Sequence, residues 1–256
     1  MRETQGTAPE RRAWWRGHVG HILLIWAGIT VAGVLFGLFL PPRLMPQPAS
    51  GTMHEVRLTV IVFTVAAAPV AALVWGIALY SLVVWRHRSS DVPPEDGPPI
   101  RGNTKVQVAW LFVSSFLTLF LLVWGLGELQ AISAQASPKP LVVDVVGQQW
   151  MWTYAYPQDG GVQSATLVLP VGRSILFRVT SKDVVHSFWI PNMGIKIDAN
   201  PGVTTEVGVT PDQLGVFNVR CAELCGLYHA YMESAVQVVS GSAFTAWVRA
   251  NGGRVG

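Results

Sequence analysis

The residues best suited to chemistry are gathered in one short segment near the end of this 256-residue chain. The segment that begins at Cys221 has the sequence Cys-Ala-Glu-Leu-Cys-Gly-Leu-Tyr-His-Ala-Tyr-Met and contains both cysteines of the protein. A further histidine lies upstream, in the sequence Asp-Val-Val-His-Ser that begins at Asp183. Thiolates, imidazoles and a thioether are the ligands that suit copper in electron-transfer sites. The pattern therefore predicts a copper centre, whose candidate ligands are His186, Cys221, Cys225, His229 and Met232.

Other uses of the two cysteines account for less of this pattern. Two cysteines with three residues between them are by themselves equally consistent with a disulfide and with a metal site, and an oxidising compartment favours the disulfide. A disulfide needs neither histidine, however, and a zinc site has no use for Met232. A mononuclear blue-copper site takes one cysteine, two histidines and a weak axial methionine. The second thiolate can instead bridge two copper ions and leave one imidazole for each, with the backbone carbonyl of Glu223 as a second weak ligand.

Ordinary structural roles are alternatives for several of these residues. Met232 also suits core packing, and Glu223 also fits a solvated loop acid. Four other histidines flank apolar segments, where residence at a membrane interface explains them without ligation. These are His18, His21, His54 and His87.

Beyond Pro140 the sequence changes to short runs rich in Val, Ile, Thr and aromatic residues, separated by Gly, Pro, Asp and Asn. Such runs predict an antiparallel β-sandwich or barrel. The predicted strands are 141–146, 150–156, 166–169, 174–180, 204–210, 215–220 and 235–239. His186 then lies in a loop after the strand that ends at residue 180, and the cysteine segment follows the strand that ends at residue 220. We expect these two ligand loops to leave the scaffold at one end.

Two further features of this region bear on packing. Four aromatic residues alternate in the second predicted strand, so they are expected to share one face of it. They are Trp150, Trp152, Tyr154 and Tyr156. Ser242 is expected to cap a short final helix that ends near residue 248.

The N-terminal half consists of long apolar blocks. A membrane-spanning helix needs about 20 mostly apolar residues, and three stretches meet that requirement, at residues 22–40, 58–85 and 106–127. Basic residues gather before the first stretch and between the second and third. The positive-inside tendency therefore places the N-terminus and the 86–105 link in the cytoplasm and everything after Glu128 outside. We divide the chain into a transmembrane region (1–137), an extracytoplasmic domain (138–241) and a C-terminal helix or tail (242–256).

The first apolar block has two interpretations. A basic start followed by an apolar run also describes a secretory signal peptide. The apolar region of a signal peptide spans about 7–15 residues, whereas this block is longer and lacks an Ala-x-Ala exit, so we favour a retained helix. The net charge of +3 is concentrated near the apolar blocks, as membrane topology requires. No basic stripe with interleaved aromatic residues predicts nucleic-acid binding.

The combined motifs resemble those of subunit II of the haem-copper cytochrome c oxidases. The CuA motif of that family is Cys-x-Glu-x-Cys-Gly-x-x-His-x-x-Met, which the segment at Cys221 matches, and the Asp-Val-x-His-Ser element at Asp183 matches as well. The run Gly-Gln-Gln-Trp-Met-Trp-Thr-Tyr-Ala-Tyr-Pro from Gly147 is similar to the aromatic segment of the family. The resemblance covers roughly residues 53–240. It implies an α+β membrane protein in which a two-helix hairpin, here with an extra N-terminal helix, precedes a cupredoxin-like β-sandwich.

Position by position, the resemblance implies a dinuclear CuA centre. Glu223 would contribute its backbone carbonyl, and its carboxylate would reach a Mg²⁺ or Mn²⁺ ion shared with subunit I. Trp150 matches the aromatic residue through which cytochrome c passes its electron. The remaining CuA ligands would be His186, Cys221, Cys225, His229 and Met232.

The same resemblance implies a role and partners. The chain would accept electrons from cytochrome c, or from a membrane-bound cytochrome, and pass them to haem in subunit I. Reduction of oxygen to water, coupled to proton translocation, would occur in that other subunit. The implied partners are subunit I, the other oxidase subunits, the cytochrome donor and membrane lipid. The implied location is the bacterial plasma membrane, as a multi-pass protein with its CuA domain on the outer side.

Some positions depart from the family. Gln107 stands where relatives usually place a glutamate near a proton-uptake entrance, and an amide cannot take up and release a proton as a carboxylate does. The proline usual after Trp110 is missing, and no Cys-x-x-Cys-His haem-attachment motif follows the copper segment. Two alternative functions therefore stay open. One is the small subunit of a CuA-type nitric-oxide reductase, and the other is a membrane-anchored copper-binding or assembly protein.

Overall fold

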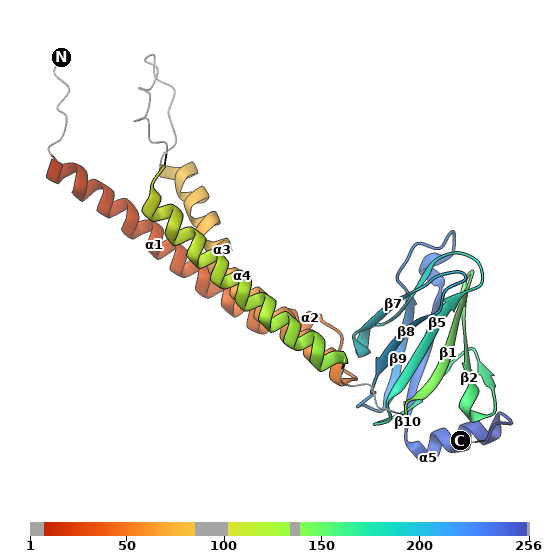
Figure 1. The fold of residues 1–256 in the computed structure, drawn as a ribbon. Coiled ribbons are helices and arrows are strands. Elements are labelled where there is room, and N and C mark those ends of the chain that lie inside the picture. The colour runs from red at the N-terminus through yellow and green to blue at the C-terminus, as the bar shows by residue number, and fades with distance from the viewer. Residues whose placement is uncertain (1–7, 85–101, 134–138, 255–256) are drawn as a thin grey trace. The chain divides into compact units, whose positions relative to one another are not determined.

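Long helices form the N-terminal part of the chain and a β-sandwich forms the C-terminal part, as Figure 1 shows for the computed structural model. The structure describes residues 8–84, 102–133 and 139–254. The chain divides into two compact units, of which the first contains Met1–Leu44 and Val60–Val123 and the second contains Met45–Thr59 and Trp124–Gly256. The second unit thus includes two segments that the sequence placed with the membrane region.

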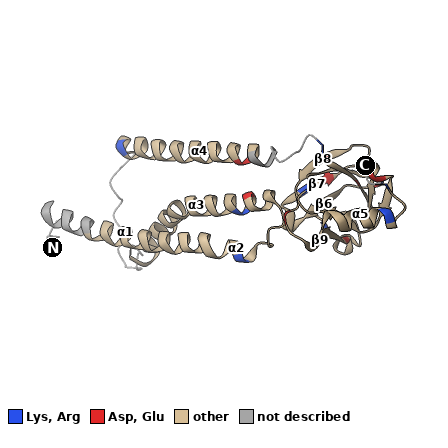
Figure 2. Ribbon diagram, turned by 90° about the horizontal axis from the view of Figure 1, so that it is seen from below, with Lys and Arg blue, Asp and Glu red and all other residues tan. Residues whose placement is uncertain are grey.

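The helices that precede the sandwich are α1 (Ala8–Phe39), α2 (Pro41–Leu44), α3 (Gly51–Val84) and α4 (Thr104–Ser133). Three stretches are long and apolar enough to cross a membrane, namely Gly17–Leu44, Gly51–Val84 and Thr104–Gln130. Figure 2 shows that α3 and α4 carry their charged residues only near their ends. The three predicted apolar stretches are therefore confirmed as helices, except that Trp85, the expected end of the second, lies outside the described residues.

Within the first unit, α1 packs closely against α3. A Cβ atom added to Gly37 would lie only 2.9 Å from Cγ2 of Thr64, so the glycine allows the two backbones to approach closely. The indole Nε1 of Trp26 donates a 2.8 Å hydrogen bond to the backbone carbonyl of Pro69, which lies inside α3. The contact between these helices thus combines small-residue packing with a directional hydrogen bond.

The described part of the second unit contains ten strands in two five-stranded sheets, with the orders β3-β2-β1-β5-β8 and β4-β10-β9-β6-β7. The strands of the first sheet are β3 (Val162–Ser164), β2 (Met151–Tyr156), β1 (Leu141–Gln148), β5 (Ile175–Ser181) and β8 (Thr205–Val209). Those of the second are β4 (Leu167–Pro170), β10 (Glu233–Val239), β9 (Gly215–Cys221), β6 (His186–Ile190) and β7 (Ile195–Ala199). The predicted sandwich is confirmed, although each sheet is mixed, because β1 pairs with β5 and β10 with β4 in parallel.

All seven predicted strands are present, with ends within two residues of the prediction. The strands β3, β6 and β7 were not predicted. Four of the five residues of β6 are buried, so this strand lacks the apolar–polar alternation that marks a half-buried strand. This difference matters for the site, because His186, which we expected in a loop, is the first residue of β6.

Aromatic side chains from both sheets fill the core of the sandwich. Trp152, Tyr154 and Tyr156 alternate along β2 and are buried. The ring of Phe188 on β6 lies 5.5 Å from that of Trp152 and 5.2 Å from that of Phe177 on β5. The prediction of a shared aromatic face is thus confirmed for these three residues of β2.

Trp150 lies outside β2 and so is not one of the alternating residues of that strand, which makes this part of the prediction wrong. The β1–β2 hairpin closes at the pair Gln148 and Met151, which leaves Gln149 and Trp150 as the two residues of the turn. The side chain of Trp150 is half-buried and packs at the edge of the core. A tight turn breaks the two-residue periodicity on which the prediction rested.

The segment that joins α2 to α3 packs against the sandwich within the second unit. Ala49 and Ser50 are completely buried. The backbone N–H of Ala49 donates to the carbonyl of Asn192 at 2.7 Å, and the hydroxyl of Ser50 donates to the carbonyl of Met193 at 2.8 Å. This connection is therefore a structural part of the second unit.

The final helix, α5 (Gly241–Ala250), extends beyond its predicted range at both ends. Its N-cap is Ser240, whose hydroxyl oxygen accepts a hydrogen bond from the backbone N–H of Ala243. Ser242, the predicted cap, lies inside the helix. The buried residues Phe244 and Val248 pack this helix onto the sandwich core.

Candidate metal centre

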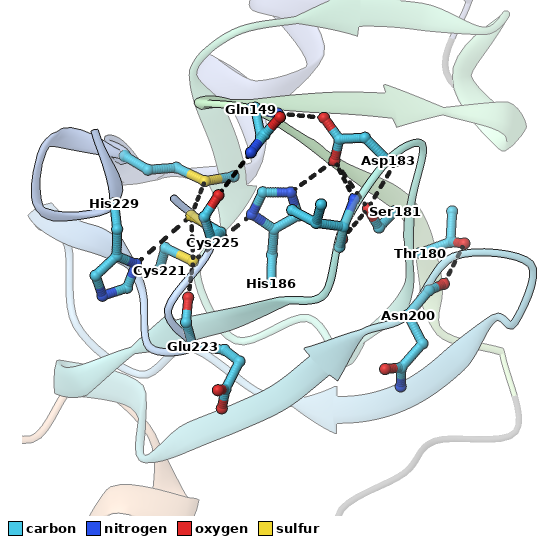
Figure 3. Close-up of polar contacts among 12 residues, drawn as sticks. Gln149, Thr180, Ser181, Asp183, His186, Asn200, Cys221, Glu223, Cys225 and His229 are labelled. Atoms are coloured by element: carbon cyan, nitrogen blue, oxygen red, sulfur yellow. Dashed lines mark hydrogen bonds and ion pairs between the residues drawn. The ribbon is translucent and has the colours of Figure 1, made fainter. Parts of the chain in front are cut away.

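The predicted ligands meet at one end of the sandwich, and Figure 3 shows the side chains of His186, Cys221, Cys225 and His229 converging on one another. His186 begins β6 and Cys221 ends β9, two strands that are hydrogen-bonded neighbours in one sheet. The loop that follows β9 carries Cys225, and a 3₁₀ turn begins at His229 and leads to Met232. Strand pairing and one short loop therefore bring together residues from two distant parts of the chain.

Two free cysteine thiols lie at the middle of the cluster. Their Sγ atoms are 3.8 Å apart, far beyond the ~2.05 Å of a disulfide bond. Nδ1 of His186 lies 3.8 Å from Sγ of Cys221, and Nδ1 of His229 lies 3.5 Å from Sγ of Cys225. Each sulfur thus has one imidazole nitrogen beside it.

Two weaker donors complete the arrangement. The backbone carbonyl oxygen of Glu223 lies 3.3 Å from Sγ of Cys221, and the Sδ atom of Met232 lies 3.8 Å from Sγ of Cys225. In Figure 3 the carboxylate of Glu223 extends away from the sulfurs. Paired thiols with imidazoles, a thioether and a carbonyl are compatible with copper, and hard-cation sites use oxygen donors instead.

The centre is buried on one side and open on the other. His186, Cys225 and Met232 are buried, whereas His229 is only half-buried. Burial, together with the adjacent Cys221 thiol, raises the pKa of the Cys225 thiol to about 12. A metal that binds here must therefore displace a proton from this sulfur, because the thiolate is the ligand.

A carboxylate holds the ring of His186. Oδ1 of Asp183 lies 2.9 Å from Nε2 of the imidazole. Burial would raise the pKa of this carboxyl, but hydrogen bonds from the backbone N–H of Gln149 and from the His186 ring outweigh it and lower the pKa to about 2. The ionised carboxylate accepts a hydrogen bond from the Nε2–H of the ring, which leaves Nδ1, the atom that faces Cys221, as the metal-binding nitrogen.

Gln149 connects the β1–β2 turn to both ligand loops. Its backbone N–H donates to Oδ2 of Asp183 at 2.7 Å. Its side-chain Nε2 donates to the backbone carbonyl of Cys225 at 2.8 Å. Figure 3 shows this amide between the Asp183 carboxylate and the cysteine loop.

Trp150 follows Gln149 in the same turn. Its ring meets that of Tyr228 edge to face, with centroids 4.8 Å apart. Tyr228 immediately precedes His229 in the ligand loop. The candidate electron-transfer tryptophan is therefore in direct contact with the loop that carries three of the predicted side-chain ligands.

Exposed apolar side chains lie in the ligand loop and next to the β1–β2 turn. Leu224, Leu227 and Tyr231 are each about four-fifths exposed, at 79%, 80% and 80%. Met151 and Tyr228 are about half exposed. We call these five residues the apolar rim. Exposed apolar side chains gathered on neighbouring loop segments are typical of a site where another protein binds.

Comparisons with known proteins point to one family. A family model for the periplasmic domain of cytochrome c oxidase subunit II matches residues 162–239. The chain is 31% identical over 231 residues to cytochrome c oxidase subunit 2 of Alkalihalophilus pseudofirmus, covering 82% of this chain and 67% of that protein. It is 30% identical over 244 residues to the probable cytochrome c oxidase subunit 2 of Streptomyces coelicolor, covering 78% of this chain and 76% of that protein. The chain belongs to the cytochrome c oxidase subunit 2 family.

This subunit 2 is accordingly part of cytochrome c oxidase, an oxidoreductase complex with further subunits. The chain is also similar to a solved structure, the periplasmic domain of subunit II of cytochrome oxidase (CoxB) of Bradyrhizobium japonicum. That likeness has 35% identity and a TM-score of 0.44, and it covers 46% of this chain and 97% of that one.

Three residues of the subunit 2 site were not assigned roles from the sequence. The role of Asp183 could have been predicted, because an acidic residue three positions before a candidate histidine ligand is a candidate hydrogen-bond partner for that histidine. No comparable sequence pattern indicates the roles of Tyr228 and Gln149. The contact of Gln149 with Cys225 joins positions 76 residues apart, which only the folded chain brings together.

Proposed function

We propose that this subunit accepts electrons from a c-type cytochrome at a dinuclear CuA centre and passes them to haem in subunit I of a respiratory oxidase. The observation that carries the proposal is the arrangement of two sulfurs 3.8 Å apart, with one imidazole nitrogen and one weak donor beside each. Cys221 and Cys225 would hold two copper ions together, and His186 and His229 would provide one imidazole for each ion. When bound, the copper pair supplies a one-electron redox centre.

The protein's part in this function is to hold the ligands still. Cys221 is tied on both sides, since its backbone N–H donates to the carbonyl of Met232 at 3.1 Å and the next N–H donates to the carbonyl of Ser187 at 2.9 Å. His186 is fixed by strand pairing and by its hydrogen bond to Asp183. Ligands carried on strands are positioned more precisely than ligands on loops. A fixed ligand set favours fast electron transfer, because little has to rearrange when the charge changes.

The apolar rim and Trp150 support a docking site for the donor cytochrome. The rim lies on the loop segments next to the candidate ligands, and Trp150 contacts Tyr228 within it. Because the rim residues carry no charge, we expect docking by apolar contact, with cytochrome oxidation rates that change little with ionic strength. Stopped-flow oxidation of a reduced soluble c-type cytochrome across salt concentrations measures this dependence.

The carboxylate of Glu223 supports a second metal site. Its backbone oxygen faces Cys221, and its exposed side chain extends away from the sulfurs. This geometry lets the carboxylate contribute to a Mg²⁺ or Mn²⁺ ion shared with subunit I, since such ions take oxygen ligands. Glu223→Gln should lower the manganese content of oxidase from manganese-grown cells and leave the copper content unchanged, as measured by elemental analysis.

Contacts of α1 with α3 support retention of the N-terminal helix in the mature protein. Nδ1 of His18 lies 2.6 Å from the hydroxyl of Tyr80 in α3, and Trp26 is hydrogen-bonded to Pro69. A signal peptide destined for removal needs no such specific packing. We propose a three-span subunit with its copper domain outside, and mass spectrometry of the purified subunit should find residues of α1. A mature N-terminus near residue 50 would contradict this.

The decisive test of the function is the metal content and spectrum of the purified oxidase. We expect two copper ions bound to this subunit and a paramagnetic resonance signal in which one unpaired electron is shared by two copper nuclei. Cys225→Ser should abolish this signal, and the wild-type complex should consume oxygen rather than nitric oxide. A single copper ion per subunit, or a disulfide between the cysteines, would refute the proposal.

A further inference from the structure

We propose that Gln149 and Asp183 form a hydrogen-bonded clasp that holds Trp150 in a fixed position relative to both copper-ligand loops. These are positioning residues, and the inference rests on the proposed function. The clasp joins the β1–β2 turn, the loop before β6 and the loop after β9. Each of these three segments carries a different part of the site.

Asp183 is the first half of the clasp. One of its carboxylate oxygens, Oδ1, accepts hydrogen bonds from Nε2 of His186 at 2.9 Å and from the backbone N–H of Val184 at 2.7 Å. The other oxygen accepts from the backbone N–H of Gln149 at 2.7 Å. One carboxylate therefore orients a candidate copper ligand and anchors the turn that carries Trp150. Hydrogen bonds to an ionised acceptor of this kind are among the stronger ones in proteins.

Gln149 is the second half. While its backbone is held by Asp183, its side-chain amide reaches across to the carbonyl of Cys225. The residue next to it in the chain is Trp150, so the two hydrogen bonds hold the turn at both sides. The turn thus has a fixed relation to His186 through the carboxylate and to Cys225 through the amide.

Gly226 shows how closely the turn and the ligand loop fit. A Cβ atom added to Gly226 would lie 3.0 Å from Nε2 of Gln149 and 3.3 Å from Cζ2 of Trp150. The backbone φ of Gly226 is +119°, a conformation that other residues rarely adopt. The loop therefore presents bare backbone to the amide and the indole. This close packing leaves Trp150 little freedom to move once the amide hydrogen bond is made.

The clasp is separate from the features that stabilise the fold. Gln149 is exposed, the side chain of Asp183 is only partly buried, and neither residue contributes to the apolar core. Their hydrogen bonds join loops at the end of the sandwich rather than strands within it. A role in positioning accounts for such contacts because electron transfer depends on a constant separation between donor and acceptor groups.

Gln149→Met tests the clasp in the complete oxidase, since methionine keeps the length of the side chain and loses the amide donor. Gln163→Met is the matched control, because Gln163 is an exposed glutamine on β3, away from the site. We expect Gln149→Met to keep two copper ions and the wild-type paramagnetic resonance spectrum. The first electron transfer from a reduced soluble c-type cytochrome should slow by about 10-fold, with an unchanged KM.

Asp183→Asn supplies a second measurement that is independent of turnover. An asparagine amide replaces one of the two acceptor oxygens by an NH₂ group, so it cannot accept all the hydrogen bonds that Gln149, Val184, His186 and Ser181 donate to the carboxylate. The ring of His186 therefore loses part of its support. Copper retention against a chelator should fall by about 10–100-fold, as is usual for partners of metal ligands, and the reduction potential of the centre should shift. Wild-type retention and potential in this variant would overturn the part of the proposal that concerns Asp183.

The outcomes separate the clasp from the function on which it rests. If Gln149→Met matches Gln163→Met in electron-transfer rate, the clasp is refuted and the copper centre is unaffected. A rise in KM at an unchanged rate would make Gln149 a docking residue, and loss of copper would make it a structural one; both overturn the proposal. A wild-type complex without two copper ions would instead remove the proposed function itself.

Discussion

Tyr156 provides the sharpest stability test, because its hydroxyl serves two backbone groups at once. The hydroxyl donates to the carbonyl of Val168 at 2.9 Å and accepts from the N–H of the same residue at 2.8 Å. Val168 lies on β4, an edge strand of its sheet, so these groups have no neighbouring strand on that side. Tyr156 is fully buried and Val168 is 3% exposed. Water therefore cannot readily replace the hydroxyl.

Tyr156→Phe should leave both groups of Val168 without a partner. Each unsatisfied buried group costs about 1–3 kcal/mol. Because the phenyl ring no longer carries a hydroxyl that must be desolvated, we expect a net loss of about 2–4 kcal/mol in the free energy of unfolding. Tyr154→Phe is the matched control: its hydroxyl also is buried on β2, but it pairs only with the hydroxyl of Ser234, at 2.6 Å. That single loss should cost about 1 kcal/mol.

Pulse proteolysis of the full chain in detergent, across a series of urea concentrations, measures this difference. With a slope of about 2 kcal/mol per molar urea, Tyr156→Phe should lower the unfolding midpoint of the second unit by about 1–2 M, and Tyr154→Phe by about 0.5 M. Copper content should be normal in both variants. If Tyr154→Phe proved as damaging as Tyr156→Phe, the argument from the edge strand would be wrong.

Three further predictions concern the site and the helices. Trp150→Ala should keep the copper spectrum and slow cytochrome oxidation, and a normal rate in stopped-flow measurements would remove Trp150 from the electron path. The pKa of the Cys225 thiol is raised to about 12, so copper must displace its proton in order to bind. The apparent copper affinity of the metal-free protein should therefore rise with pH between about 6 and 8. Chelator competition that gave the same affinity at every pH would contradict this. Gly37→Leu should weaken the contact of α1 with α3, since its Cβ would crowd Thr64. Gly28→Leu is the control and should not weaken this contact, because its Cβ would meet nothing within 4 Å among the described residues. Equal protease resistance of the two variants in detergent would count against the packing of α1 on α3.

The elements of this protein that depend on residues close together in the sequence could be predicted from the local sequence pattern. The apolar stretches predicted the helices, because crossing a membrane requires an unbroken apolar length. Short runs of β-type residues predicted seven of the strands. The β6 strand was not predicted, because most of its side chains are buried. It therefore lacks the apolar–polar alternation that identifies a strand with one exposed face.

The candidate ligands also fall into those that local sequence predicts together and one that only the fold brings to them. Cys221, Cys225, His229 and Met232 belong to one segment, so residue type and spacing were enough to propose a copper site. The approach of His186 to Cys221 depends on the pairing of β6 with β9, which joins residues 35 positions apart. The displacement of Trp150 from the aromatic face of β2 depends on a tight turn that local alternation does not reveal.

The sequence by itself determined which donor atoms are present and which segments are apolar enough to leave water, since both follow from side-chain chemistry and short-range order. Only the tertiary structure decided that Asp183 holds His186, that Gln149 joins Asp183 to the cysteine loop, and that Ser50 is buried against the sandwich. The physical reason is that these contacts join atoms far apart along the chain. Hydrogen bonds act over about 3 Å, so such partners become defined only when strand pairing has placed them within reach.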